Sequence, residues 1–157
     1  MAQTVIIIGA GFAGLQAARS LGELARMRED LAVRLFDRNP YTTMIPGLPD
    51  LAGGRYADRL LTAPIEACVP PSVTLHVETV TGIDLPKRTV RTGQNAYGYD
   101  YLVIASGSVT NFYGFDQHLE AVHKLDSLDD ANRLRDDFQA YLERVERPVA
   151  LVVGGGY

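Results

Sequence analysis

The sequence predicts an α/β fold in which a parallel β-sheet carries flanking helices and a small antiparallel β-meander. Three observations predict it. A β-branched run at residues 4–8 stops at Gly9, small and apolar residues recur at helical spacing over residues 12–27, and a second apolar run occupies residues 32–37. A strand–helix–strand unit of about 30 residues forms a right-handed crossover between parallel strands.

The size and charge of the chain favour one globular core without polyanionic partners. Its 157 residues include 46% hydrophobic and 22% charged residues, an ordinary globular composition. A net charge of -4 gives no broad cationic field for nucleic acid or anionic lipid. The apolar run near the start falls well short of the roughly 18 residues of a membrane span, so a cytoplasmic protein is expected.

Proline and glycine divide the middle of the chain. They are dense over residues 39–55, which excludes a regular helix or central strand and predicts a long loop. Residues 56–69 are predicted to be helical with an interruption at Pro64. Cys68, on the apolar face of this helix, is expected to be a core residue. It is the single cysteine of the chain, and no histidine lies near it at metal-ligand spacing, so no metal site is expected.

Closely spaced short strands are predicted after this region, at residues 73–80, 82–85, 87–91 and 99–105. Residues 84–86 and 93–98 are expected to separate them. This pattern predicts an antiparallel meander that leads back into the main sheet.

The last part of the chain begins with a predicted helix over residues 127–147. It starts at a capping-box-like Ser127-x-x-Asp130 and has an apolar stripe that is expected to pack in the core. Residues 148–153 follow as another buried-strand pattern that leads into Gly154-Gly155-Gly156 and resembles the beginning of the chain. The stripe consists of Ala131, Leu134, Phe138, Leu142 and Val145.

The glycine motif Gly9-x-Gly11-x-x-Gly14 carries the chemistry, because it follows a strand and opens a helix. In a dinucleotide-binding turn the first glycine permits the tight bend, the second lets a pyrophosphate approach, and the third lets the helix lie close to the strand. The helix N-terminus then stabilises the phosphates. Asp37, at the end of the next strand, is placed to accept hydrogen bonds from an adenosine ribose.

A third signal is the strand at residues 99–105, which ends in the turn Ala105-Ser106-Gly107. Together with both glycine-rich turns, it makes the chain resemble the flavoproteins with two dinucleotide-binding domains, the pyridine nucleotide-disulfide oxidoreductase superfamily. That resemblance implies a Rossmann-like FAD/NAD(P)-binding fold. An alanine-threonine-glycine-like turn there marks the crossing to the NAD(P)H domain, and Ser106 is a conservative departure that keeps the hydroxyl.

Within the superfamily the chain is most similar to type II NADH dehydrogenases. The resemblance implies that FAD is the cofactor, that NAD(P)H is the electron donor and that a quinone or another small molecule is the acceptor. No side chain is predicted to act as an acid, base or nucleophile. Val80 enters by the resemblance alone, as a backbone contact to adenine. The FAD-binding residues expected are Gly9, Gly11, Phe12, Ala13, Gly14, Asp37, Arg38, Val80, Ala105, Ser106 and Gly107.

The resemblance also implies a domain organisation. Residues 1–110 would belong to a discontinuous FAD-binding domain, and residues 111–147 would form a connecting segment and helix. Residues 148–157 would be the first strand and the truncated glycine motif of the NAD(P)H-binding domain. The 157 residues alone are expected to be inactive. A membrane-peripheral location on the inner face of the cytoplasmic membrane would depend on further regions. A homodimer is left as an alternative to a monomer.

Other functions remain open at this point. The chain could instead be part of a sulfide:quinone reductase or of a ferredoxin reductase-like flavoenzyme. It could also be a truncated, non-catalytic nucleotide-binding module. A dithiol relay like that of the disulfide reductases is excluded within the chain, because it needs two cysteines and only Cys68 is present.

Overall fold

A computed structural model describes residues 3–93, 95–114 and 122–153, which divide into two compact units. The first contains the described residues of Met1–Thr43 and Thr62–Val109. The second contains those of Met44–Leu61 and Thr110–Tyr157.

The first unit is built on a four-stranded parallel sheet. Its strands are β1 (Gln3–Ile8), β2 (Leu31–Asp37), β5 (Val73–Val77) and β9 (Tyr101–Ile104), in the order β5-β2-β1-β9. Both neighbours of β1 run parallel to it, as does β5 beside β2. The predicted parallel sheet is confirmed.

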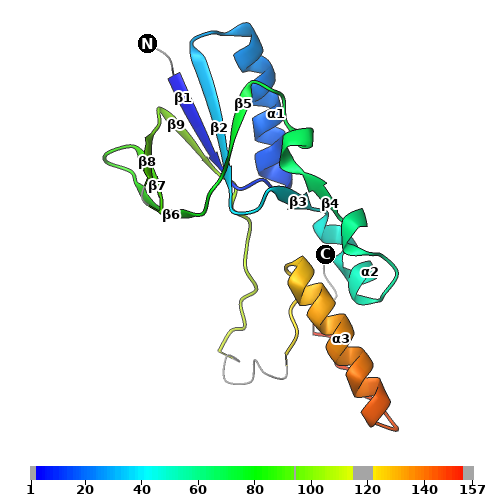
Figure 1. Cartoon of the computed structure of the whole chain (residues 1–157). Coiled ribbons are helices and arrows are strands. Elements are labelled where there is room, and N and C mark those ends of the chain that lie inside the picture. The colour runs from blue at the N-terminus through cyan, green and yellow to red at the C-terminus, as the bar shows by residue number, and fades with distance from the viewer. Residues whose placement is uncertain (1–2, 94, 115–121, 154–157) are drawn as a thin grey trace. The chain divides into compact units, whose positions relative to one another are not determined.

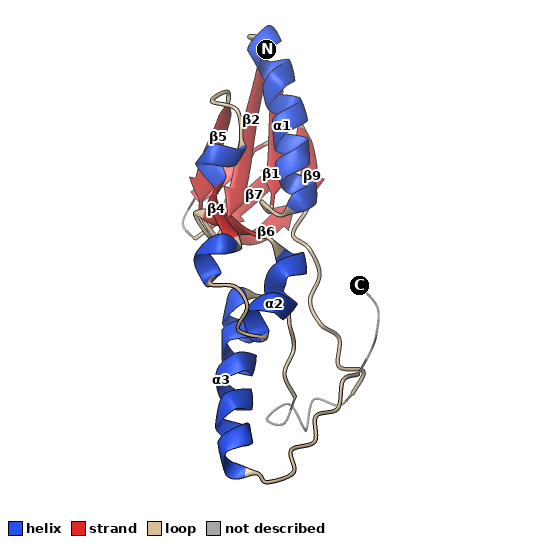
Figure 2. Ribbon diagram, turned by 90° about the vertical axis from the view of Figure 1, so that its right-hand side faces the viewer, coloured by secondary structure: helices blue, strands red, loops and turns tan. Residues whose placement is uncertain are grey.

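Helix α1 (Phe12–Met27) covers one face of this sheet and lies in front of the strands in Figure 2. Leu15 and Ala18 of the helix are buried in the same core cluster as Ile7 and Leu35 of the strands. Full burial of each large aliphatic side chain contributes about 1.5–3 kcal/mol. The apolar spacing that predicted the helix is therefore the face that holds it on the sheet.

The antiparallel meander covers the opposite face (Figure 1). It consists of β6 (Val80–Asp84), β7 (Thr89–Thr92) and β8 (Asn95–Gly98) in that order. Phe36 and Val90, both buried, belong to the core between the meander and the main sheet. The meander is confirmed, but residues 95–98 form a strand where a separator was predicted. Gly93, at φ +39, permits the tight turn that brings β8 back along β7.

Two predictions for the middle of the chain are wrong. The predicted loop at 39–55 contains β3 (Tyr41–Thr43), η1 (Ile45–Gly47) and the short helix α2 (Leu48–Ala52). The predicted helix at 56–69 is instead η2 (Asp58–Leu60), β4 (Thr62–Pro64) and η3 (Ile65–Cys68). Proline lacks a backbone N–H and ends regular helices, whereas it is tolerated in a two-stranded ribbon such as the one that β3 and β4 form.

The second unit packs α2 against helix α3 (Leu128–Arg144). Leu48, Leu51 and Ala131 are fully buried there together with Leu61. The predicted helix start is confirmed, since the Ser127 hydroxyl oxygen accepts a 3.2 Å hydrogen bond from the Asp130 N–H.

The apolar stripe of α3 is buried only near its beginning. Ala131 is fully buried, whereas Phe138 and Leu142 are 40% and 41% exposed. The prediction that the whole stripe packs in a core is therefore wrong. Helix α2 has 5 residues against the 17 of α3, so at about 1.5 Å per residue it covers only the first turns.

The strand predicted at residues 148–153 is not formed. Val149 and Leu151 are 80% and 87% exposed, and no described residue forms a β-ladder with this segment. A strand requires a neighbour for its backbone hydrogen bonds, so an apolar run without one stays irregular. The glycine-rich turn that was expected next lies outside the described residues.

Candidate functional site

The turn between β1 and α1 requires glycine at its first position. Gly9 has φ +97, and a Cβ atom there would lie 2.3 Å from the carbonyl oxygen of Ala105. Backbone hydrogen bonds fix the turn on both sides, from Gly9 N to Phe36 O at 2.8 Å and from Ala105 N to Ile8 O at 2.8 Å. The predicted role of Gly9 in the tight bend is confirmed.

The other two glycines differ sharply in their surroundings. A Cβ atom at Gly14 would lie 1.8 Å from the carbonyl oxygen of Gly9, so a side chain there would push α1 away from the turn. At Gly11 a Cβ atom would meet no heavy atom within 4 Å. Gly14 therefore serves the close packing that was predicted, and Gly11 faces open space at the start of the helix.

The N-terminus of α1 has no side-chain cap. Gly11 is its N-cap residue and forms no side-chain cap, and the first turn contains no acidic residue. Phe12, 58% exposed, and the exposed Ala13 follow directly. The first N–H groups of a helix lack partners within it and carry the positive end of its dipole, which is the feature that phosphate sites at helix N-termini use.

Ala105-Ser106-Gly107 lies beside the glycine turn, although the two segments are far apart in the sequence. β1 and β9 are neighbours, and the chain order of the strands reverses between them. Open parallel sheets bind ligands at such a switch point, outside the carboxyl ends of the strands. Ala105 is half-buried against Gly9 and Gly14, whereas Ser106 and Gly107 are exposed.

Asp37 is joined to the same turn by a contact that the sequence did not predict. Its Oδ2 atom accepts a hydrogen bond from the Ala10 N–H at 2.7 Å, and its Oδ1 atom accepts one from the Asn39 N–H at 2.9 Å. A carboxylate offers about four acceptor positions, so two of them remain for a ribose hydroxyl. Ala10 was missed as a contributor, and its place between two glycines of the turn was the available signal.

Arg38 and Val80 complete the predicted set from separate positions. The Arg38 side chain is exposed at the end of β2. Val80 begins β6 and packs on the core beneath the meander. Among the described strands β6 pairs with β7 alone, so it is an edge strand of the meander.

The rest of the described chain offers few competing sites. No group of three or more histidine, cysteine or acidic residues in the described part could hold a metal ion. Cys68 is a half-buried free thiol that packs against the core under α1. Among the described residues, no helix has the length and apolar character that crossing a membrane requires.

Comparison with protein families gives a match over nearly the whole chain. The family model described as pyridine nucleotide-disulphide oxidoreductase matches residues 3–157. Among curated proteins, the type II NADH:quinone oxidoreductase of Staphylococcus aureus (strain NCTC 8325 / PS 47) is 27% identical over 96% of this chain. That of Staphylococcus haemolyticus (strain JCSC1435) is 28% identical over the same share. The chain spans 39% of the length of each.

Solved structures give the same picture of the fold. The sulfide:quinone oxidoreductase of the hyperthermophilic bacterium Aquifex aeolicus is similar with a TM-score of 0.77 and 26% identity, over 91% of this chain and 33% of that protein. NDH2 of Plasmodium falciparum, solved in complex with NADH, has a TM-score of 0.76 at 21% identity, over 92% of this chain and 30% of its own. The latter likeness concerns the fold alone.

Proposed function

The chain belongs to the pyridine nucleotide-disulphide oxidoreductase family, and from that premise we propose that it forms an FAD site of an enzyme that takes hydride from NAD(P)H and passes electrons to a quinone. One observation carries the proposal. The Gly9 turn, the Asp37 carboxylate and the Ala105 turn meet at the point where the strand order reverses.

The residues at this point fit the ADP half of FAD. Gly11 leaves open the space that a pyrophosphate needs, and the uncapped N-terminus of α1 adjoins it. Asp37, held by two backbone N–H groups, presents its remaining acceptor positions to a ribose. Its negative charge also disfavours a 2′-phosphate there, which supports an adenosine without that group.

The other proposed contacts surround this centre. Phe12 and Ala13 would contribute the first backbone N–H groups of α1, and Val80 would offer its free strand edge to adenine. Arg38 and the Ala105-Ser106-Gly107 turn are the remaining proposed contacts. Bound FAD would supply the hydride-accepting chemistry, while these residues bind and orient it.

The quinone is proposed from the relatives. The two staphylococcal proteins are named NADH:quinone oxidoreductases, and the Aquifex protein is named a sulfide:quinone oxidoreductase. Two of these names share the NADH donor and all three share the quinone. NAD(P)H is proposed as the donor because NADH appears in the names of the two staphylococcal relatives.

A titration of FAD into the purified chain tests the cofactor. Quenching of flavin fluorescence with a saturable affinity is the expected result, and FAD that stays free in solution would refute the site. Bleaching of flavin absorbance by NADH, with and without a soluble quinone, tests the reaction. Because the chain spans 39% of these relatives, we expect the reaction to require the whole protein and not these 157 residues alone.

A further inference from the structure

Glu78 lies in the connection between β5 and β6 and joins three segments through one carboxylate. Its Oε1 atom accepts a hydrogen bond from the Tyr97 hydroxyl of β8 at 2.8 Å. Its Oε2 atom accepts one from the Thr92 hydroxyl of β7. Thr92 is 2% exposed, so its hydroxyl is buried at this contact. Both oxygens of the carboxylate are thus engaged by hydroxyl donors of the meander.

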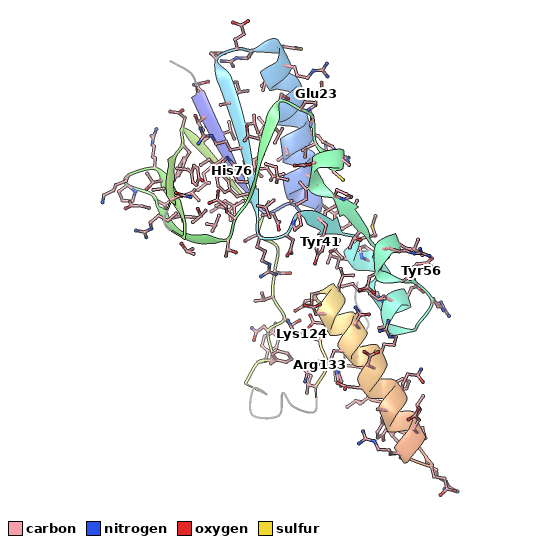
Figure 3. The ribbon with its side chains drawn as sticks, viewed as in Figure 1. Glu23, Tyr41, Tyr56, His76, Lys124 and Arg133 are labelled. Atoms are coloured by element: carbon pink, nitrogen blue, oxygen red, sulfur yellow. The ribbon has the colours of Figure 1, made fainter. Side chains whose placement is uncertain are left out.

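His76 of the main sheet approaches the same carboxylate and is packed between two other rings. The His76 Nδ1 atom lies 3.4 Å from Glu78 Oε1. The His76 imidazole stacks on Phe36 of β2, with 4.4 Å between ring centroids and 5° between planes, and Tyr97 meets both rings edge-on. Figure 3 shows His76 where the main sheet meets the meander. Contacts from β5, β7 and β8 therefore converge on Glu78, and Phe36 of β2 packs on the His76 ring that makes one of them.

These contacts fix the beginning of β6. Val80, two residues after Glu78, pairs with Thr92, and the register of β6 on β7 shifts between Val80 and Gly82. Such a bulge redirects a strand locally. Thr92 therefore pairs with the backbone at Val80 and also donates to Glu78. Glu78 thus connects the strand pair that contains Val80 to His76 of the main sheet.

We propose that Glu78 is a positioning residue that holds the free backbone edge at Val80 in the geometry required by the adenine ring of FAD. The inference rests on the proposed function. Adenine presents an amino donor beside ring-nitrogen acceptors, which match the C=O and N–H groups of a strand edge. A shift of this edge by a fraction of an ångström would lengthen both bonds. Glu78 itself need not touch the ligand.

The charge of Glu78 strengthens this arrangement. The hydrogen bonds from Thr92 and then Tyr97 lower the pKa of Glu78 below its ordinary value of 4.5. The carboxylate is therefore ionised at neutral pH, and hydrogen bonds to an ionised acceptor are about twice as strong as neutral ones. Replacement by the neutral glutamine keeps the size and one oxygen acceptor but removes the charge.

Titration of the full chain with FAD and with ADP, which contains the adenine but no flavin, tests the proposal. We expect Glu78→Ala to weaken both ligands by the same factor, roughly tenfold, and Glu78→Gln to fall between it and the unmodified chain. Glu66→Ala, at an exposed glutamate of η3, is the matched control and should leave both affinities unchanged. Thermal unfolding of each variant identifies a temperature at which all are folded.

The outcomes separate the two proposals. If the unmodified chain binds neither ligand, the proposed FAD site is refuted. If it binds both while Glu78→Ala binds them equally well, the positioning role alone is refuted, even when the variant melts at a lower temperature. Should Glu78→Ala not fold, Tyr97→Phe and Thr92→Val each remove one donor to the carboxylate. Unchanged ADP affinity in both would overturn the inference.

Discussion

The carboxylate of Asp37 accepts a hydrogen bond from the backbone N–H of Ala10, with 2.7 Å between Oδ2 and the nitrogen. This bond ties the end of β2 to the middle of the glycine turn. The residue that is proposed to bind the ribose therefore also holds the turn that is proposed to bind the pyrophosphate. Loss of the carboxylate should therefore lower both the free energy of unfolding and the affinity for FAD.

Asp37→Ala is expected to weaken FAD binding by roughly 1–3 kcal/mol and to lower the free energy of unfolding by a similar amount. Both backbone N–H groups, of Ala10 and Asn39, lose their acceptor. Flavin fluorescence titration and urea unfolding measure the two effects. Asp84→Ala is the control, since Asp84 likewise accepts a backbone hydrogen bond, from Lys87, but lies in the meander. FAD affinity unchanged by Asp37→Ala would remove this residue from the site.

Gly9→Ala should destabilise the fold itself. The added Cβ atom would lie 2.3 Å from the Ala105 carbonyl oxygen, and the backbone has φ +97, which disfavours alanine. We expect a loss of about 2–4 kcal/mol in the free energy of unfolding, which urea unfolding monitored by circular dichroism would measure. Stability equal to that of the unmodified chain would mean that the turn adopts another geometry.

Gly11→Val, unlike Gly9→Ala, should leave the free energy of unfolding unchanged but should prevent flavin binding. Its backbone has φ −75, which valine can adopt, and the Cβ atom meets no protein atom within 4 Å. The new side chain would instead fill the space of the pyrophosphate. Gly98→Val serves as the control, because its Cβ atom is equally free of contacts in the meander. A Gly11→Val chain that carries stoichiometric FAD would contradict the proposed motif.

Tyr97 makes the stability of the meander sensitive to alkaline pH. The hydrogen bond to Glu78 raises the pKa of Tyr97 above its ordinary value of 10.0. A group whose pKa is raised by folding contributes stability that is complete below its unfolded pKa and is lost as pH rises through the folded one. The difference in free energy of unfolding between the unmodified chain and Tyr97→Phe should therefore be constant up to about pH 10 and shrink above it.

Urea unfolding of both chains from neutral to strongly alkaline pH checks this dependence. Tyrosinate absorbance gives a second measure, because the ionisation that is missing from Tyr97→Phe should lie above the ordinary tyrosine pKa of 10.0. A difference that stays constant over the whole range in which the chain is folded would show that Tyr97 does not depend on Glu78.

The first strand–turn–helix–strand unit could be predicted because its signals are local. The β-branched run, the glycine spacing and the helical apolar stripe each occupy consecutive residues, and the helix bounds at Phe12 and Met27 agree with the prediction. The meander and the N-cap at Ser127 were likewise marked by local turn and capping residues. Predictions failed where pairing competed with local propensity, as at Pro64, where a two-stranded ribbon replaced the expected helix.

The sequence by itself determined the parallel strands, the turn at Gly9 and the acidic end of β2, since spacing along the chain carries each of these signals. Only the tertiary structure decided that Ala105 lies against that turn, that Asp37 binds Ala10, and that Glu78 joins the meander to the main sheet. Each of these contacts joins residues from different elements. Their partners are selected by strand order and register, which depend on how whole elements pack and not on the residues next to each other in the chain.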